Sequence, residues 1–242
     1  MLTRAKPENL DKPRRFWTAV DVAQGEGGFV VRLDGRVAKT PAGAPLALPT
    51  RALAELVAEE WAAQGETVEF ATMLATRLAS TVIDRVPAQR QAVARETAKY
   101  AGSDLTCYLA EDPPALIQAE QALWRPVLDW AEAELGLRFA QTAGLAHTPQ
   151  PPETIARVEA LAAAMDDWRL TALAFAAPLF GSAVLALALA HGRLTGEEAF
   201  DASRVDEAFQ ERRWGVDAEA ADRTARLRAE AAMLQRWFEA LA

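Results

Sequence analysis

The sequence predicts an α+β protein in which a small, antiparallel β-rich N-terminal domain at residues 1–70 precedes a larger all-helical domain at residues 71–242. Two observations lead to this division. Between residues 16 and 48, short runs of apolar and β-branched residues alternate with glycine-containing turns, which is typical of strands. From residue 50 onward, apolar side chains recur every three to four positions, which is typical of amphipathic helices.

The predicted strands are separated by two strong turn signals. A glycine cluster at residues 25–28 separates the first two strands. Asp34-Gly35 follows the second strand and favours a two-residue turn, because both central positions of that turn need positive φ. Strands are therefore expected at residues 16–22, 29–33, 36–40 and 46–48, with a brief return to the sheet at 67–70.

Helices are delimited by capping and breaking residues. Thr50 can cap the first helix, which should end at Gly65. Further helices are expected at residues 73–86, 87–101 and 114–135. Pro126 should break the last of these, because proline lacks the N–H that an interior helical position donates.

The C-terminal part contains a proline-rich linker at residues 147–152 and then more helices. Thr195 with Glu198 forms a capping-box signature, and a single helix is expected from there to Trp214, with Gly215 placed to cap its end. A final amphipathic helix should pack along one narrow apolar stripe.

One uncharged stretch, residues 170–190, is about as long as a membrane span. Pro178 and Gly181-Ser182 interrupt it, and much of it is alanine, so two shorter buried helices are the preferred interpretation. A membrane-anchored factor is the alternative.

Composition excludes several classes of function. With 34 acidic and 26 basic residues, the formal net charge of −8 opposes binding to nucleic acid phosphates. The single cysteine cannot form an internal disulfide. One cysteine and two histidines are also too few for an ordinary zinc site. The first residues carry charge and proline without an apolar signal region, so no secretory peptide is expected.

No catalytic constellation is recognisable. Cys107 lies in an apolar context without a cationic neighbour and is expected to be a small buried side chain. His147 falls in the linker and His191 at a helix end, where its cation could face the helix dipole. The glycine cluster lacks phosphate-loop spacing. From these residues alone, the chain is a soluble acidic protein without an assigned activity.

Two further features could belong to a binding surface. The chain has seven tryptophans, of which most should be core and one or two could anchor an interface. Residues 204–215 mix opposite charges with aromatic side chains at one helix end. A solvated helix face with ion pairs between neighbouring turns is the simpler explanation of that segment.

Several strings in order resemble a known family. They are Arg15-Phe16-Trp17, Leu33-Asp34-Gly35-Arg36, Thr40-Pro41, Glu60-Trp61 with Gln64, Ser103 to Tyr108, Trp124-Arg125-Pro126 with Trp130, Leu185 to Leu189, Glu197-Glu198-Ala199, and Asp206 to Gln210 with Trp214-Gly215. Across nearly the whole chain, the sequence resembles the assembly chaperones of the F-type ATP synthase alpha subunit, found in mitochondria and alphaproteobacteria.

This resemblance implies a non-catalytic protein that needs no cofactor or metal. Its expected partner is the alpha subunit of the ATP synthase catalytic head, which it would bind and protect from aggregation until the beta subunit replaces it. We expect neither nucleic acid binding nor stable membrane insertion, and a monomer. The location would be the bacterial cytoplasm, or the mitochondrial matrix in a eukaryote.

The resemblance also implies partner-binding residues. An acidic residue in the helix before the Trp-Gly pair corresponds to Asp206 or Glu207, and Glu211 lies on the same helix. Trp61 matches a tryptophan that the family needs, but its place on an apolar helix face indicates a structural role. The alternative function is an enzyme with a carboxylate-lined cleft between the domains.

Overall fold

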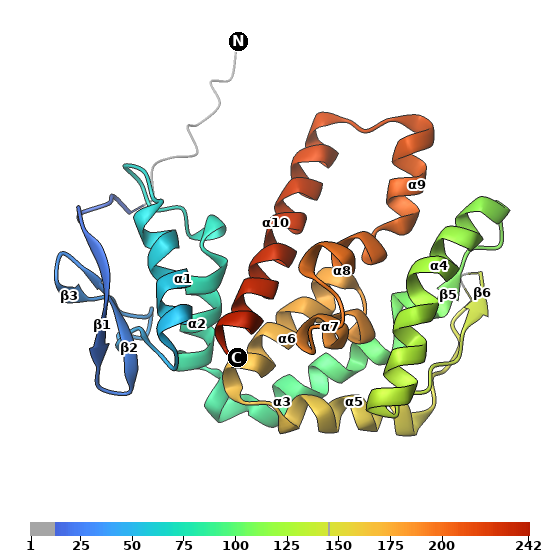
Figure 1. The fold of residues 1–242 in the computed structure, drawn as a ribbon, viewed down its shortest axis with the longest axis horizontal. Helices are drawn as coiled ribbons and strands as arrows, with labels where there is room; N and C mark the ends of the chain where they lie inside the picture. The colour runs from blue at the N-terminus through green and yellow to red at the C-terminus, as the bar shows by residue number, and fades with distance from the viewer. Residues whose placement is uncertain (1–12, 145) are drawn as a thin grey trace, which may run out of the picture. The chain divides into compact units, whose positions relative to one another are not determined.

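The computed structural model describes residues 13–144 and 146–242 and confirms an α+β protein (Figure 1). Its contacts group the chain into two compact units, Met1–Asp84 and Arg85–Ala242. A domain boundary after residue 70 stays a prediction.

The first unit is built on a four-stranded antiparallel sheet. Its strands are β1 (Val20–Gly25), β2 (Gly28–Leu33), β3 (Arg36–Val37) and β4 (Ala47–Leu48). Strand β2 pairs with each of the other three. Asp34 and Gly35 have φ values of 47° and 76°, as the predicted two-residue turn requires. The first strand begins four residues later than expected, because the Asp34 carboxylate accepts the backbone N–H groups of Thr18 and Ala19.

Two helices complete the first unit. Helix α1 (Arg51–Ala62) begins where the Thr50 hydroxyl accepts the Leu53 N–H, as predicted, and it packs on β1 and β2. Helix α2 (Leu74–Asp84) follows a 3₁₀ turn, Phe70–Thr72. The expected strand at 67–70 is reduced to a single bridge between Thr67 and Arg14.

The second unit is almost entirely helical. Its α-helices are α3 (Val86–Ala98), α4 (Pro114–Trp130), α5 (Pro152–Ala164), α6 (Asp167–Phe180), α7 (Ala183–Ala190), α8 (Gly196–Ser203), α9 (Val205–Trp214) and α10 (Ala218–Ala240). Helix α4 ends in a π-helical turn, Ala131–Leu135, and two short parallel strands, β5 (Tyr108–Leu109) and β6 (Thr142–Ala143), lie beside it.

Helices α6 and α7 form the centre of this unit's core. The side chains of α7 are buried from Ala183 to Leu189, and α7 packs against α4, α6 and α8. Gly181, with φ of 62°, ends α6 and separates the two helices, so the prediction of two shorter buried helices is confirmed. Across residues 13–144 and 146–242, no helix has the length and apolar character needed to cross a membrane.

Two helix predictions are wrong. Helix α4 continues through Pro126, because that residue is solvent-exposed and the carbonyl it leaves unpaired, on exposed Ala122, can bond to water. The helix expected from Thr195 to Trp214 is two helices, since Arg204 leaves helical conformation with φ −126° and ψ 22°. The predicted capping box and the Gly215 cap are both present.

Candidate partner-binding site

A helical arm projects from the second unit at the place where the partner-binding residues are predicted. We define the arm as residues 206–230, which comprise α9 after Val205, the connection at residues 215–217 and the first half of α10 (Figure 1). No side chain of the arm is fully buried, whereas Val205 before it and Ala231 after it are. A ten-residue helix has little stability of its own in water. The arm is therefore held by few contacts, and most of its surface is accessible to solvent.

Glu207 and Glu211 share one cation at the base of the arm. Arg204, in the break between α8 and α9, reaches Glu207 Oε1 at 3.4 Å and Glu211 Oε1 at 3.3 Å. Its guanidinium also stacks over the Phe200 ring, 6.0 Å from the centroid. The two glutamates thus lie on one face of α9 and remain partly open to solvent.

Asp206 is placed differently, because it lies against α4 and meets Glu120. Glu120 is fully buried, and its Oε2 accepts the Ala110 N–H at 2.8 Å. Glu120 Oε1 and Asp206 Oδ1 are both buried, and neither has a hydrogen-bonding N–H or O–H within the described residues. Two facing carboxyl oxygens can bond only if one of them carries a proton.

The surroundings of Glu120 raise the pKa of its carboxyl group. Burial is the largest effect on Glu120 and, together with the hydrogen bond and negative charge of Asp206, raises its pKa to about 7. The Ala110 N–H acts in the opposite direction but does not offset these effects. The pair is therefore poised to gain or lose one proton near neutral pH.

Sequence reasoning missed Glu120, although a signal was present. Leu116, Glu120 and Trp124 follow each other at intervals of four residues in α4, so they lie on one face of the helix. All three are buried. A carboxyl group at a core position of an otherwise apolar stripe needs a partner. The partner here is Asp206 of α9, which lies 86 positions later in the sequence.

The tip of the arm carries exposed apolar side chains. Trp214 is 73 % exposed and Val216 is 53 % exposed. The guanidinium of Arg213 lies 5.8 Å from the centre of the Trp214 ring. Of the seven tryptophans, four are buried, at positions 17, 61, 124 and 237. Trp214 is thus the tryptophan with the exposure expected of an interface anchor.

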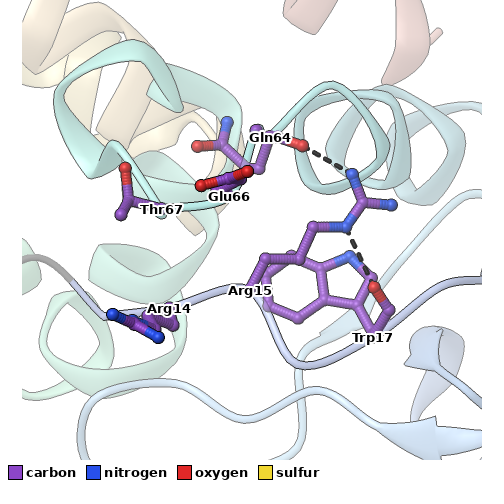
Figure 2. Close-up of a pocket in the computed structure, with 7 residues that line it drawn as sticks. Arg14, Arg15, Trp17, Gln64, Glu66 and Thr67 are labelled. Carbon is purple, nitrogen blue, oxygen red and sulfur yellow. Dashed lines mark hydrogen bonds between the residues drawn. The ribbon is translucent and has the colours of Figure 1, made fainter.

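The first unit contains a hollow of about 610 Å³ beside Arg15, Trp17 and Gln64 (Figure 2). Arg15 Nε donates to the Trp17 carbonyl at 2.9 Å, and Arg15 Nη1 donates to the Gln64 carbonyl at 2.5 Å. Because backbone oxygens take up these donors, Arg15 fastens the N-terminal segment to the end of α1. These hydrogen bonds account for the position of the Arg15 guanidinium, so no anionic ligand is needed to explain it.

The cysteine and histidine considered as candidate reactive groups show no sign of activation. Cys107 is buried as predicted, and burial raises the pKa of its thiol to about 12. Burial and Arg169 lower the pKa of His191, so the expected cation at the end of α7 is not favoured. Among the described residues, no group of three or more His, Cys, Asp or Glu side chains could hold a metal ion.

An exposed helical arm that carries carboxylates and a tryptophan is typical of proteins that bind other proteins. Comparisons with known proteins agree. The family model described as ATP12 chaperone protein matches residues 14–132. The chain is similar to the mitochondrial protein atp12 of Schizosaccharomyces pombe, with 25 % identity over 216 residues, which cover 84 % of this chain and 74 % of the relative.

Solved structures are similar over almost the entire chain. Atp12 from Paracoccus denitrificans is 40 % identical, with a TM-score of 0.86, over 95 % of this chain and 99 % of the other. The Atu1473 protein from Agrobacterium tumefaciens is 42 % identical, with a TM-score of 0.87, over 95 % and 87 % of the two chains. The chain belongs to the ATP12 chaperone family, and the predicted class, chaperones of ATP synthase assembly, is confirmed.

Proposed function

We propose that this chaperone binds the unassembled alpha subunit of the ATP synthase catalytic head and keeps it from aggregating until the beta subunit takes its place. The observation that carries the proposal is the arm, which ends in an exposed tryptophan and has no buried side chain of its own. The identity of the partner comes from the family resemblance.

The physical task of such a chaperone is to cover apolar surface temporarily. A subunit that has not met its neighbours exposes apolar surface, which promotes aggregation. A small interface with one aromatic anchor and a polar surround can cover such a surface and still be displaced by a partner that buries more area. Trp214 would supply the anchor, and Glu207 and Glu211 would supply part of the polar surround.

We assign Asp206, Glu207 and Glu211 different contributions within this surface. Glu207 and Glu211 are accessible and can exchange Arg204 for a cation of the partner. Asp206 instead faces Glu120 and positions α9 against α4. The protein would act by binding alone, as a monomer without nucleic acid or cofactor, in the bacterial cytoplasm or the mitochondrial matrix.

The experiment that tests this site is a binding measurement with purified alpha and beta subunits. Size exclusion should give a complex with alpha and none with beta. Glu207→Lys should weaken binding of alpha at least tenfold, whereas Glu153→Lys should not. Glu153 is a matched control because it is also an exposed glutamate in the first turn of a helix, α5. Circular dichroism confirms that both variants fold.

The two possible failures have different meanings. If neither subunit binds to the unmodified protein, the proposed function is wrong. If alpha binds but both variants bind it as well as the unmodified protein does, the function stands and the arm is not the contact surface.

A further inference from the structure

Beyond the identity of the partner, the arm raises the question of what holds it to the rest of its unit. Helix α9 packs against α4 but buries only Val205 fully. At this contact, Glu120 of α4 and Asp206 of α9 bring two carboxyl groups together, each with a buried oxygen that has no hydrogen-bond donor in the described residues. Removing two unpaired anions from water in this way is costly.

Within residues 13–144 and 146–242, no ion pair joins a cation to Glu120 or Asp206. Arg204, the nearest arginine in sequence to Asp206, forms its ion pairs with Glu207 and Glu211. Helix α7, which also packs on α4, has no ionisable side chain. In the 3₁₀ turn Leu105–Cys107, the buried Cys107 thiol is neutral, because its pKa is raised to about 12.

The remaining ionisable groups near α4 have other partners or lie in solvent. Tyr108 of β5 bonds to His147. Of the acids of α8, Glu197 and Asp201 bind Arg228 and Glu198 closes the capping box. On α4 and the π-helical turn that follows it, Arg125 pairs with Asp129, Glu132 pairs with Arg138, and Glu134 is exposed. Also exposed are Glu111 and Asp112 before α4 and Arg212 and Arg213 at the end of α9.

We propose that Glu120 and Asp206 form a proton-dependent latch, in which one shared proton fastens α9 to α4 and loss of that proton loosens the arm. With the proton present, a carboxyl–carboxylate hydrogen bond joins the two helices. Without it, two like charges face each other where water is excluded, so the arm separates to hydrate them. The latch regulates the surface proposed above for alpha binding, but it is a property of the free protein.

The direction of the pH effect follows from linkage. The folded pKa of Glu120, about 7, lies above the ordinary value of 4.5 that the group regains when the arm opens. A carboxyl whose pKa is raised in the closed state stabilises that state fully at low pH, and this contribution is lost as the pH rises through 7. Between pH 6 and pH 8, the closed-to-open equilibrium constant should fall about tenfold.

Hydrogen–deuterium exchange of the free protein tests the latch. After correction for intrinsic exchange, the protection factors of the α9 amides should fall about tenfold from pH 6 to pH 8, while those of the core helix α7 should not. Glu120→Gln should abolish this fall, because its amide oxygen can accept the Ala110 N–H while its NH₂ donates permanently to Asp206. Glu219→Gln, the same change at an exposed position in the first turn of α10, should behave like the unmodified protein.

Two results would overturn the latch. One is equal pH dependence of α9 protection in the unmodified protein and in E120Q, and the other is no pH dependence in the unmodified protein. If E120Q does not fold, carbon-13 NMR of the unmodified protein decides, since a Glu120 carboxyl that titrates below pH 5 contradicts the proposal. Because no alpha subunit is present, failure here is separate from failure of the proposed function.

Discussion

Glu60 on α1 holds the first turn of α2 through Thr76, whose backbone N–H and hydroxyl both donate to Glu60 Oε2 at 2.8 Å. Glu60 Oε1 accepts the Ala75 N–H at the same distance. A buried carboxylate from one helix thus satisfies the free N–H groups at the start of another, where the helix dipole also favours negative charge.

Replacing Glu60 should therefore destabilise the protein. Glu60→Ala leaves two buried N–H groups unpaired and removes side-chain volume, so we expect a loss of about 2–4 kcal/mol in the free energy of unfolding, measured by urea denaturation. Glu55→Ala on the same helix removes only an exposed ion pair with Arg51 and should cost under about 0.5 kcal/mol. If the free energy of unfolding falls equally in the two variants, the hydrogen bonds of Glu60 do not stabilise the protein.

Asp104 plays the corresponding role in the second unit. It is completely buried, and its two oxygens accept the N–H groups of Thr106 and Val184 and the Thr106 hydroxyl. Asp104→Asn turns one acceptor into a donor that faces existing donors, so we expect a loss of about 2–4 kcal/mol by denaturant unfolding. Asp129→Asn, at an exposed ion pair, is the matched control and should stay within about 0.5 kcal/mol of the unmodified protein.

The Cys107 thiol should be unreactive in the folded protein. With a pKa of about 12, only on the order of one thiol in ten thousand is ionised at pH 8, and the side chain is fully buried. A thiol-reactive chromogenic reagent should react with Cys107 only after urea is added. It should then label one thiol per chain. Labelling of the native protein within seconds would mean that the residue is accessible and activated.

Trp214 should matter for binding and not for stability. Trp214→Ala is expected to weaken alpha binding at least tenfold while leaving the melting temperature unchanged, because the side chain is 73 % exposed. Phe16 is also 73 % exposed but belongs to the first unit, so Phe16→Ala is the matched control. Isothermal titration with alpha measures both. Similar loss of affinity in the two variants would contradict the assignment of the arm.

Much of the fold could be predicted because its signals are local. The Asp34-Gly35 turn, the Thr50 cap and the Thr195–Glu198 capping box each depend on residues within a few positions of one another. The break at Arg204 had no such signal. It depends on contacts of the Arg204 guanidinium with Phe200 and with glutamates of the next helix.

The candidate site was only partly predictable for the same reason. Asp206 could be selected by resemblance, but its interaction with Glu120 joins positions 86 residues apart, which no periodicity within one helix reveals. Glu60, Asp104 and Glu120 are all acidic residues that prove to be buried. The sequence shows that such residues need partners, but the fold decides which partners they find.

The central claim is tested most directly by light scattering from the alpha subunit as it refolds from denaturant. The account predicts that an equimolar amount of this protein suppresses scattering by forming a complex with alpha, and that beta subunit added afterwards releases the chaperone while alpha enters an alpha–beta assembly. Unchanged scattering, or a complex from which beta cannot displace the protein, would contradict it.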